Sequence, residues 1–194
     1  MPTIAVPNIL VGPGYLFWAP LGTAVPAHTV TASKFTDAWP VAWIPLGATQ
    51  EGTTEKWSTK VEAIEVAEFL DPIQWATTGR EGSVAAALAD YTLANLKRAM
   101  NGGTQSVVSG TGATTLTKLE PPIVGAEVRC MLGWESVDST LRSVFYQCFQ
   151  GGEMESKYAK APDKATIPVE FKLEVPASGI PWSKWAAGTA RAGV

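Results

Sequence analysis

The sequence predicts a single, mainly β domain with one flanking α-helix, and three observations lead to this prediction. Across 194 residues, 18 glycines and 14 prolines separate short apolar runs, which is typical of many strands joined by turns. Residues 166–175 alternate between apolar and charged side chains, as a half-buried strand does. Residues 92–100 combine a capping threonine, an apolar stripe at helical spacing and a stop at Asn101-Gly102-Gly103, which indicates a helix.

The first half of the chain contains strands and one long loop. Residues 14–19 predict a short strand, and residues 41–46 predict an edge segment interrupted by Pro45. Residues 20–40, rich in Pro, Ala, Thr and Ser, predict a long loop. Residues 53–69 are ambiguous, because their glutamates recur every three residues as on a helix face, whereas their threonines and β-branched residues favour a strand. The strand interpretation is slightly favoured.

The second half predicts the centre of the sheet. Residues 73–78 predict a strand, residues 79–82 a turn or bulge, and residues 83–89 either a strand or a helix. Residues 104–119 predict a hairpin. Residues 127–134 and 141–149 are apolar on both alternating faces, so we expect central strands buried on both sides. One domain of residues 1–194 is expected, with an N-terminal arm at 1–12 and a C-terminal arm at 178–194.

Composition argues against several classes of protein. A formal net charge of −3, with Lys97-Arg98 as the nearest thing to a basic cluster, disfavours a phosphate-gripping nucleic-acid binder. We expect no membrane span and no secretory signal, because no apolar run approaches the roughly 20 residues that a span needs and no basic residue precedes the first apolar stretch. Cys130 and Cys148 lie in apolar runs and are expected to be buried free thiols.

No catalytic or metal-binding pattern is present in the sequence. The single histidine, His28, rules out a zinc-binding HExxH helix and is expected to be a solvated loop side chain. The three glutamates of residues 62–68 are close enough to raise the idea of paired catalytic carboxylates, but a solvated face is the more common reason for such a run. We therefore expect neither an enzyme nor a cofactor.

Eight tryptophans are many for this length, and five of them lie at or within the predicted loop and arm. They flank the long loop or belong to the C-terminal arm: Trp18, Trp39, Trp43, Trp182 and Trp185. Tryptophans in loops and arms often anchor contacts between subunits. The alternative, that each arm packs on its own domain, is equally open.

Residues 46–52, LGATQEG, resemble the leucine-glycine-x-x-x-glutamate-glycine turn of major tail tube proteins from long, non-contractile-tailed bacteriophages. The resemblance continues through a strand pair, the Leu70-Asp71-Pro72 turn, residues 77–80 and 83–89, and a leucine-x-asparagine-leucine helix that ends at Gly102-Gly103. Upstream, residues 19–26 resemble the arm and loop of members from actinobacterial phages. The three alanines at 85–87 depart from the larger strand formers usual in the family.

This resemblance implies a tail-tube-type β-sandwich or barrel whose copies form hexameric rings, and the rings stack into a virion tail tube that conducts DNA. It implies assembly in the host cytoplasm, with tape measure, tail terminator and distal tail proteins as partners. Glu62, Glu65 and Glu68 are the candidates for a lumen wall that repels phosphates. The long loop and the C-terminal arm are the candidates for contacts between rings.

Three other functions remain open. A head–tail completion or tail terminator protein would form one ring but no tube. A carbohydrate-binding β-sandwich would stack exposed tryptophans, such as Trp39 or Trp43, on sugar. A hydrolase is least favoured, because the sequence lacks a recognisable pair of nucleophile and base.

Overall fold

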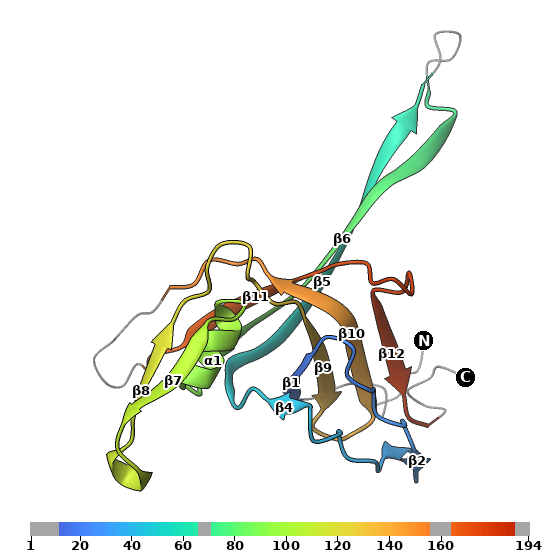
Figure 1. The fold of residues 1–194 in the computed structure, drawn as a ribbon. Helices are drawn as coiled ribbons and strands as arrows, with labels where there is room; N and C mark the ends of the chain where they lie inside the picture. The colour runs from blue at the N-terminus through green and yellow to red at the C-terminus, as the bar shows by residue number, and fades with distance from the viewer. Residues whose placement is uncertain (1–11, 66–70, 156–163, 189–194) are drawn as a thin grey trace.

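The computed structural model describes residues 12–65, 71–155 and 164–188. Strands dominate these residues and one α-helix accompanies them, so the prediction of a mainly β fold is confirmed (Figure 1). The chain forms a curved body, from which one hairpin projects far beyond the other elements (Figure 1). Most of the predicted N-terminal arm, and residues 189–194 of the predicted C-terminal arm, lie outside the described residues.

One antiparallel sheet organises the body, in the order β4-β1-β9-β10-β11-β6-β5. β12 pairs with the first half of β10, and β11 pairs with its last three residues. The strands of this sheet are β1 (Gly14–Pro20), β4 (Ile44–Pro45), β5 (Thr49–Ile64), β6 (Gln74–Leu88), β9 (Cys130–Ser136), β10 (Leu141–Gln150), β11 (Ile167–Leu173) and β12 (Trp182–Ala186). Two small ribbons lie apart from it: β2 (Val30–Thr31) with β3 (Lys34–Phe35), and β7 (Thr104–Ser109) with β8 (Leu116–Glu120), the latter linked through the 3₁₀ turn η2 (Gly112–Thr114).

The two ends of the sheet meet, which gives the body the character of a barrel. β4 pairs with β1 at one end, and the chain runs directly from β4 into β5 at the other end. The backbone N–H of Leu46 donates to Leu16 in β1 at 2.9 Å, and the N–H of Ala89 donates to Ala48 at 2.7 Å. Closure of this kind leaves fewer free strand edges in the body.

β9 and β10 are buried on both faces, as the sequence predicts. Leu132 and Phe145 belong to the larger core cluster inside the curved sheet, whereas Met131 and Val144 face a second cluster under the long loop. Cys130 and Cys148 are buried free thiols, and burial raises the pKa of Cys130 to about 12. These thiols are therefore protonated and unreactive at neutral pH.

The helix α1 (Leu93–Ala99) forms where the sequence predicts it. The side chain of Thr92 accepts a hydrogen bond from the Asn95 N–H at 3.2 Å, which caps the first turn. The helix ends at Asn101 and Gly102, both with positive φ, and Ala99 packs into the larger core cluster. The prediction of a hairpin at residues 104–119 is confirmed by β7 and β8.

Three segments differ from or extend the sequence predictions. Residues 182–186 form β12, so this part of the predicted C-terminal arm belongs to the sheet, and Ala187 after it is buried. The long loop at 20–40 carries the small β2–β3 ribbon. β6 runs without a break through residues 79–82, and the expected irregularity is a bulge beside Gly79 in its pairing with β5.

Candidate assembly surfaces

The outer part of the β5–β6 hairpin stands clear of the body. We call residues 57–64 and 74–82 the projecting hairpin, because β6 pairs with β11 only from Ser83 onward. Eight residues of strand span roughly 25 Å. Among the residues that the structure describes, β5 pairs with β6 and with no other strand, so its outer edge is unpaired. An isolated two-stranded hairpin is at best marginally stable in water, so this element needs another surface.

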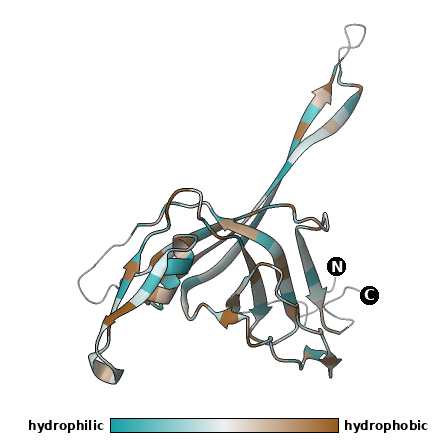
Figure 2. Cartoon of the chain, viewed as in Figure 1, coloured by the Kyte–Doolittle hydropathy of each residue, from teal (hydrophilic) through white to brown (hydrophobic). Residues whose placement is uncertain are grey.

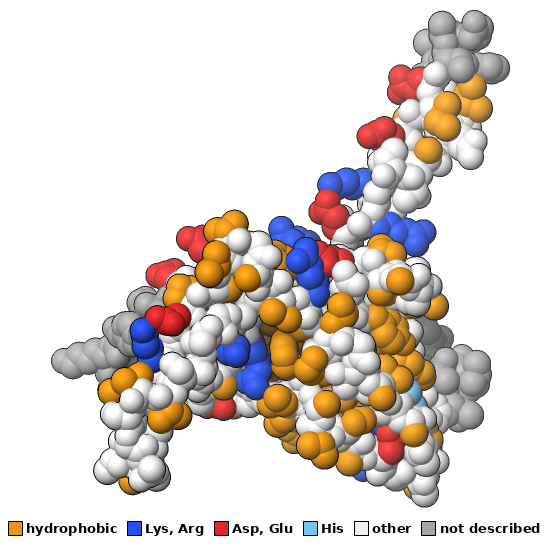
Figure 3. Space-filling model, in the orientation of Figure 1, with side chains coloured by type: hydrophobic (Ala, Val, Ile, Leu, Met, Phe, Trp, Pro, Cys, Tyr) orange, Lys and Arg blue, Asp and Glu red, His pale blue; other side chains and the backbone are white. Residues whose placement is uncertain are grey.

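The projecting hairpin has one apolar and one charged face. Directly paired residues share a face, and the pairs Trp57–Gly82, Val61–Thr77 and Ala63–Trp75 make the apolar one, together with Thr59 and Arg80. Residues between them make the charged face, namely Ser58, Lys60, Glu62 and Glu81, and Lys56 continues this face at the base of the hairpin. Hydrophobic residues gather at the outer end (Figure 2), and charged side chains line the side opposite to them (Figure 3). Outward from Trp57, the side chains of Val61 and Trp75 on this face are more than half exposed among the residues that the structure describes.

The root of the hairpin is braced by the C-terminal strand. The Trp57 ring packs edge-on against Trp182 of β12, with ring centroids 5.8 Å apart. A side chain at Gly82 would collide with the Trp57 ring, so the glycine allows the indole to lie flat across the strand pair. Lys184 of β12 donates to Glu55 at 2.6 Å. These contacts fix the direction in which the hairpin leaves the body.

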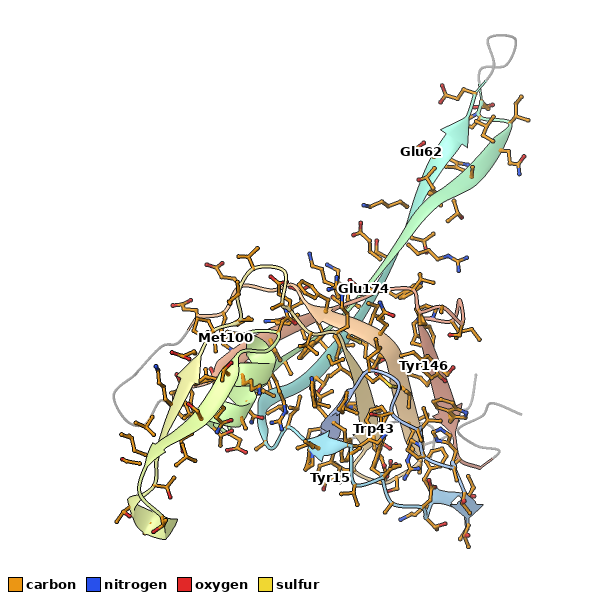
Figure 4. The ribbon with its side chains drawn as sticks, in the orientation of Figure 1. Tyr15, Trp43, Glu62, Met100, Tyr146 and Glu174 are labelled. Carbon is orange, nitrogen blue, oxygen red and sulfur yellow. The ribbon has the colours of Figure 1, made fainter. Side chains whose placement is uncertain are left out.

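Of the three predicted acidic residues, the structure describes Glu62 and Glu65. Glu62 is exposed on the hairpin, away from the body (Figure 4), and shares its face with Lys60 and Lys56. Glu65 follows the end of β5, and Glu68 lies outside the described residues. Residues three apart in a strand point to opposite faces, so the spacing of these glutamates favours a single wall only in a helix. Their role in a lumen wall stays a prediction.

The five tryptophans are largely engaged within their own chain. Trp43 is 3% exposed, and its indole N–H donates to the Ala24 carbonyl at 2.8 Å (Figure 4). Trp39 stacks on Phe17, Trp185 stacks on His28, and Trp18 packs on the larger core cluster. Trp182 keeps 37% of its surface exposed beside the hairpin root. Of the five, Trp182 therefore has the most surface left for another subunit.

A buried charge network, which the sequence analysis missed, pins the long loop to the sheet. Arg142 in β10 is 1% exposed and donates to Glu135 at 2.8 Å and to the Asp37 carboxylate at 3.0 Å. Its guanidinium lies over the rings of Phe35 and Trp39. Burial acts to raise the pKa of Asp37, but the hydrogen bond and charge of Arg142 outweigh it and lower that pKa. Arg142 is the one charged residue of β10, and this was the available signal in the sequence.

The prediction of a solvated His28 is wrong. The imidazole stacks on Trp185 with ring centroids 3.8 Å apart, and both ring nitrogens are enclosed without a hydrogen-bond partner among the described residues. Burial, and then the nearby Arg142, lower the pKa of His28. The contact joins residues far apart in sequence, which is why local composition did not reveal it.

A cavity of about 390 Å³ lies between α1, β1 and the start of β7. Trp18, Val128 and the basic residues Lys97 and Arg98 contribute to its lining, and no acidic residue does so among those that the structure describes. The Arg98 guanidinium lies 5.3 Å from the centroid of the Trp18 ring and donates to Asn95 Oδ1 at 2.8 Å. Burial lowers the pKa of Arg98 from its ordinary value. The cavity thus presents an apolar wall with two cations.

Within residues 12–65, 71–155 and 164–188, no cluster of three or more His, Cys, Asp or Glu side chains is placed to hold a metal ion. In the same ranges, no helix has the length and apolarity needed to cross a membrane. Comparison of the chain with models of protein families gives no match, and comparison with curated protein sequences gives none either. The function is therefore inferred from the residues and the geometry.

Proposed function

We propose that this protein is a structural virion subunit that assembles into stacked hexameric rings and so forms the tail tube of a long-tailed phage. The observation that carries the proposal is the projecting hairpin, which continues the 16-residue edge strand β5 and has an exposed apolar face. Such an edge is a template for pairing with another chain, and natural proteins usually cover or shorten it. A neighbouring copy is the partner that would cover it in every molecule.

The surface chemistry is consistent with an assembling subunit. The most exposed large apolar residues of the hairpin and of the described residues at its outer end are Val61, Ile64, Ile73 and Trp75, with exposed fractions of 51%, 45%, 57% and 64%. Apolar side chains of this size on an extended ribbon mark a protein–protein contact, because they gain stability only when another surface removes them from water. The family resemblance of residues 47–103 adds the geometry of rings, the passage of DNA through the lumen and the tape measure, terminator and distal tail partners.

The alternatives fit the structure less well. Trp43 is buried and Trp39 is packed against Phe17, so neither offers the open aromatic platform that sugar stacking would require. A tail terminator or head–tail completion protein would also use the hairpin, but its rings would not stack.

Electron microscopy of the purified full chain at high concentration, in several salt conditions, tests the proposal. We expect rings with a central pore and stacked tubes. The matched variants are Val61→Lys, on the apolar face, and Ser58→Lys, on the charged face three residues earlier in the outer half of the same strand. Val61→Lys should abolish assembly, because it buries an unpaired charge in the contact, whereas Ser58→Lys should assemble. A chain that stays monomeric in every condition would overturn the proposal, and single rings that never stack would favour the terminator function.

A further inference from the structure

The end of the projecting hairpin is complementary to the cavity beside α1. We define the hairpin tip as the described residues 62–65 and 71–75. It carries three carboxylates, Glu62, Glu65 and Asp71, and no basic residue. Its apolar side chains include Ile73 and Trp75, both more than half exposed. The tip is therefore acidic and apolar.

The cavity has the opposite charge. Lys97 and Arg98 line it, and among the described residues neither forms a salt bridge. Arg98 is held in place by Asn95 and by the Trp18 ring, so its cation is positioned before any partner arrives. Basic side chains gather over α1 beside hydrophobic ones on the face seen in Figure 3. The volume of about 390 Å³ lies within the roughly 300–1,000 Å³ of ligand pockets, so it can admit large side chains.

A tip and a cavity of the same copy cannot meet. The hairpin leaves the body in a direction away from α1 (Figure 1), and its root is fixed by Trp182 and Lys184. A contact between them must therefore join two copies. Because one copy contributes its tip and the other its cavity, the contact is heterologous and propagates from copy to copy into a ring or an open-ended stack.

We infer that the hairpin tip of one copy docks into the α1 cavity of a second copy, where its apolar side chains cover Trp18 and Val128 and its carboxylates pair with Lys97 and Arg98. This inference rests on the proposed assembly function and specifies one of its contacts. A second copy is favoured over a free phosphate or a nucleic acid because the cavity combines its two cations with an apolar wall. The tip offers both matching features.

Charge reversal tests the pairing in the full chain. The tip variant carries Glu62→Lys with Glu65→Lys, so its tip and its cavity are both basic. The cavity variant carries Lys97→Glu with Arg98→Glu, so its tip and its cavity are both acidic. Each alone should need at least about tenfold more protein to assemble, since like charges would face each other. An equal mixture should assemble like wild type, because each basic tip meets an acidic cavity and each acidic tip a basic one. The control exchanges the exposed pair on β8, Lys118→Glu with Glu120→Lys, and should leave assembly unchanged.

Sedimentation velocity and electron microscopy provide the readout, with circular dichroism to establish that each variant is folded. Folded single variants that assemble like wild type, or a mixture that fails to recover, would overturn this contact while leaving the proposed function intact. Wild-type protein that never assembles would overturn both. Inorganic phosphate that stabilises wild type but not the cavity variant, with assembly unaffected by the reversals, would assign the cavity to an anion instead.

For a variant pair that does not fold, cysteine cross-linking at Ile73→Cys and Gln105→Cys in the otherwise wild-type chain gives a second measurement. Gln105 lies at the rim of the cavity. We expect the double variant to form a ladder of disulfide-linked oligomers under oxidation, and each single variant to form no ladder beyond a dimer. The absence of a ladder from assembled protein would overturn the contact.

Discussion

The central strands and the projecting hairpin are both antiparallel β structure, yet their side chains lie in opposite environments. β9 and β10 pack against a core cluster on each face. The projecting hairpin, including Trp57 and Trp75, leaves both faces largely in solvent. The body obtains its stability from contacts within one chain, whereas the hairpin has surfaces that only another molecule can cover. Changes in the body should therefore alter unfolding, and changes in the hairpin should alter association.

The largest expected effect comes from breaking the charge network of the body. Arg142→Met would leave the Glu135 and Asp37 carboxylates without their buried cation. Removing one partner of a buried ion pair typically costs about 3–5 kcal/mol, and we expect a loss of that size in the free energy of unfolding by urea. The matched change Arg80→Met, in the exposed hairpin, should stay within about 0.5 kcal/mol of wild type. Equal effects at the two sites would contradict the division between body and hairpin.

A smaller effect is expected from His28, which joins the long loop to β12. Its pKa is lowered in the folded chain, first by burial and then by Arg142, against the weaker opposing effects of Asp37 and Glu135. The unfolded chain therefore takes up a proton first, so the free energy of unfolding falls as the pH drops from about 6.5 towards the lowered folded pKa. We expect less than about 1 kcal/mol between pH 7.5 and 5.5, because the residue is only partly buried and solvent screens it.

The check on this prediction is the pH dependence itself. His28→Asn removes the titrating ring, and asparagine tolerates the positive φ of this position. Urea unfolding of the variant at the same pH values should lose the slope that wild type has in this range, whatever its absolute stability. A slope that persists in the variant would assign the effect to other groups.

Much of the body could be predicted from the sequence, because its signals are local. The alternation of residues 166–175 predicted β11, and the capping threonine with its glycine stop predicted α1. The apolar runs at 127–134 and 141–149 predicted β9 and β10, because strands buried on both faces need no polar alternation. In each of these cases the residue pattern that predicts the element also determines how the element packs.

The features that were missed depend on contacts between distant residues or on other molecules. The engagement of Arg142 with the loop residue Asp37 joins positions 105 apart, so no window of sequence contains both. β12 is stabilised by its pairing with β10, and the composition of the Ala- and Gly-rich segment that contains it does not predict this pairing. The length of the hairpin could not be predicted either. A strand that faces solvent on both sides has no alternation of apolar and polar residues that would mark where the body ends.

The smallest expected effect on unfolding is that of Trp75→Ala in the hairpin, and the same substitution at Trp43 in the body is its reference. Trp43→Ala in the body should cost about 3–5 kcal/mol, because it empties a buried site and removes the hydrogen bond to Ala24. Trp75→Ala at the hairpin tip should change the unfolding of dilute, monomeric protein by no more than about 0.5 kcal/mol, because the ring is 64% exposed. Urea titrations at low concentration measure both. At high concentration the order should reverse: folded Trp75→Ala protein should fail to assemble in sedimentation experiments, since the ring contributes its buried area only in the contact with a second copy. A Trp75→Ala variant as unstable as Trp43→Ala would mean that the hairpin packs onto its own body, and the surface assigned to a neighbour would already be occupied.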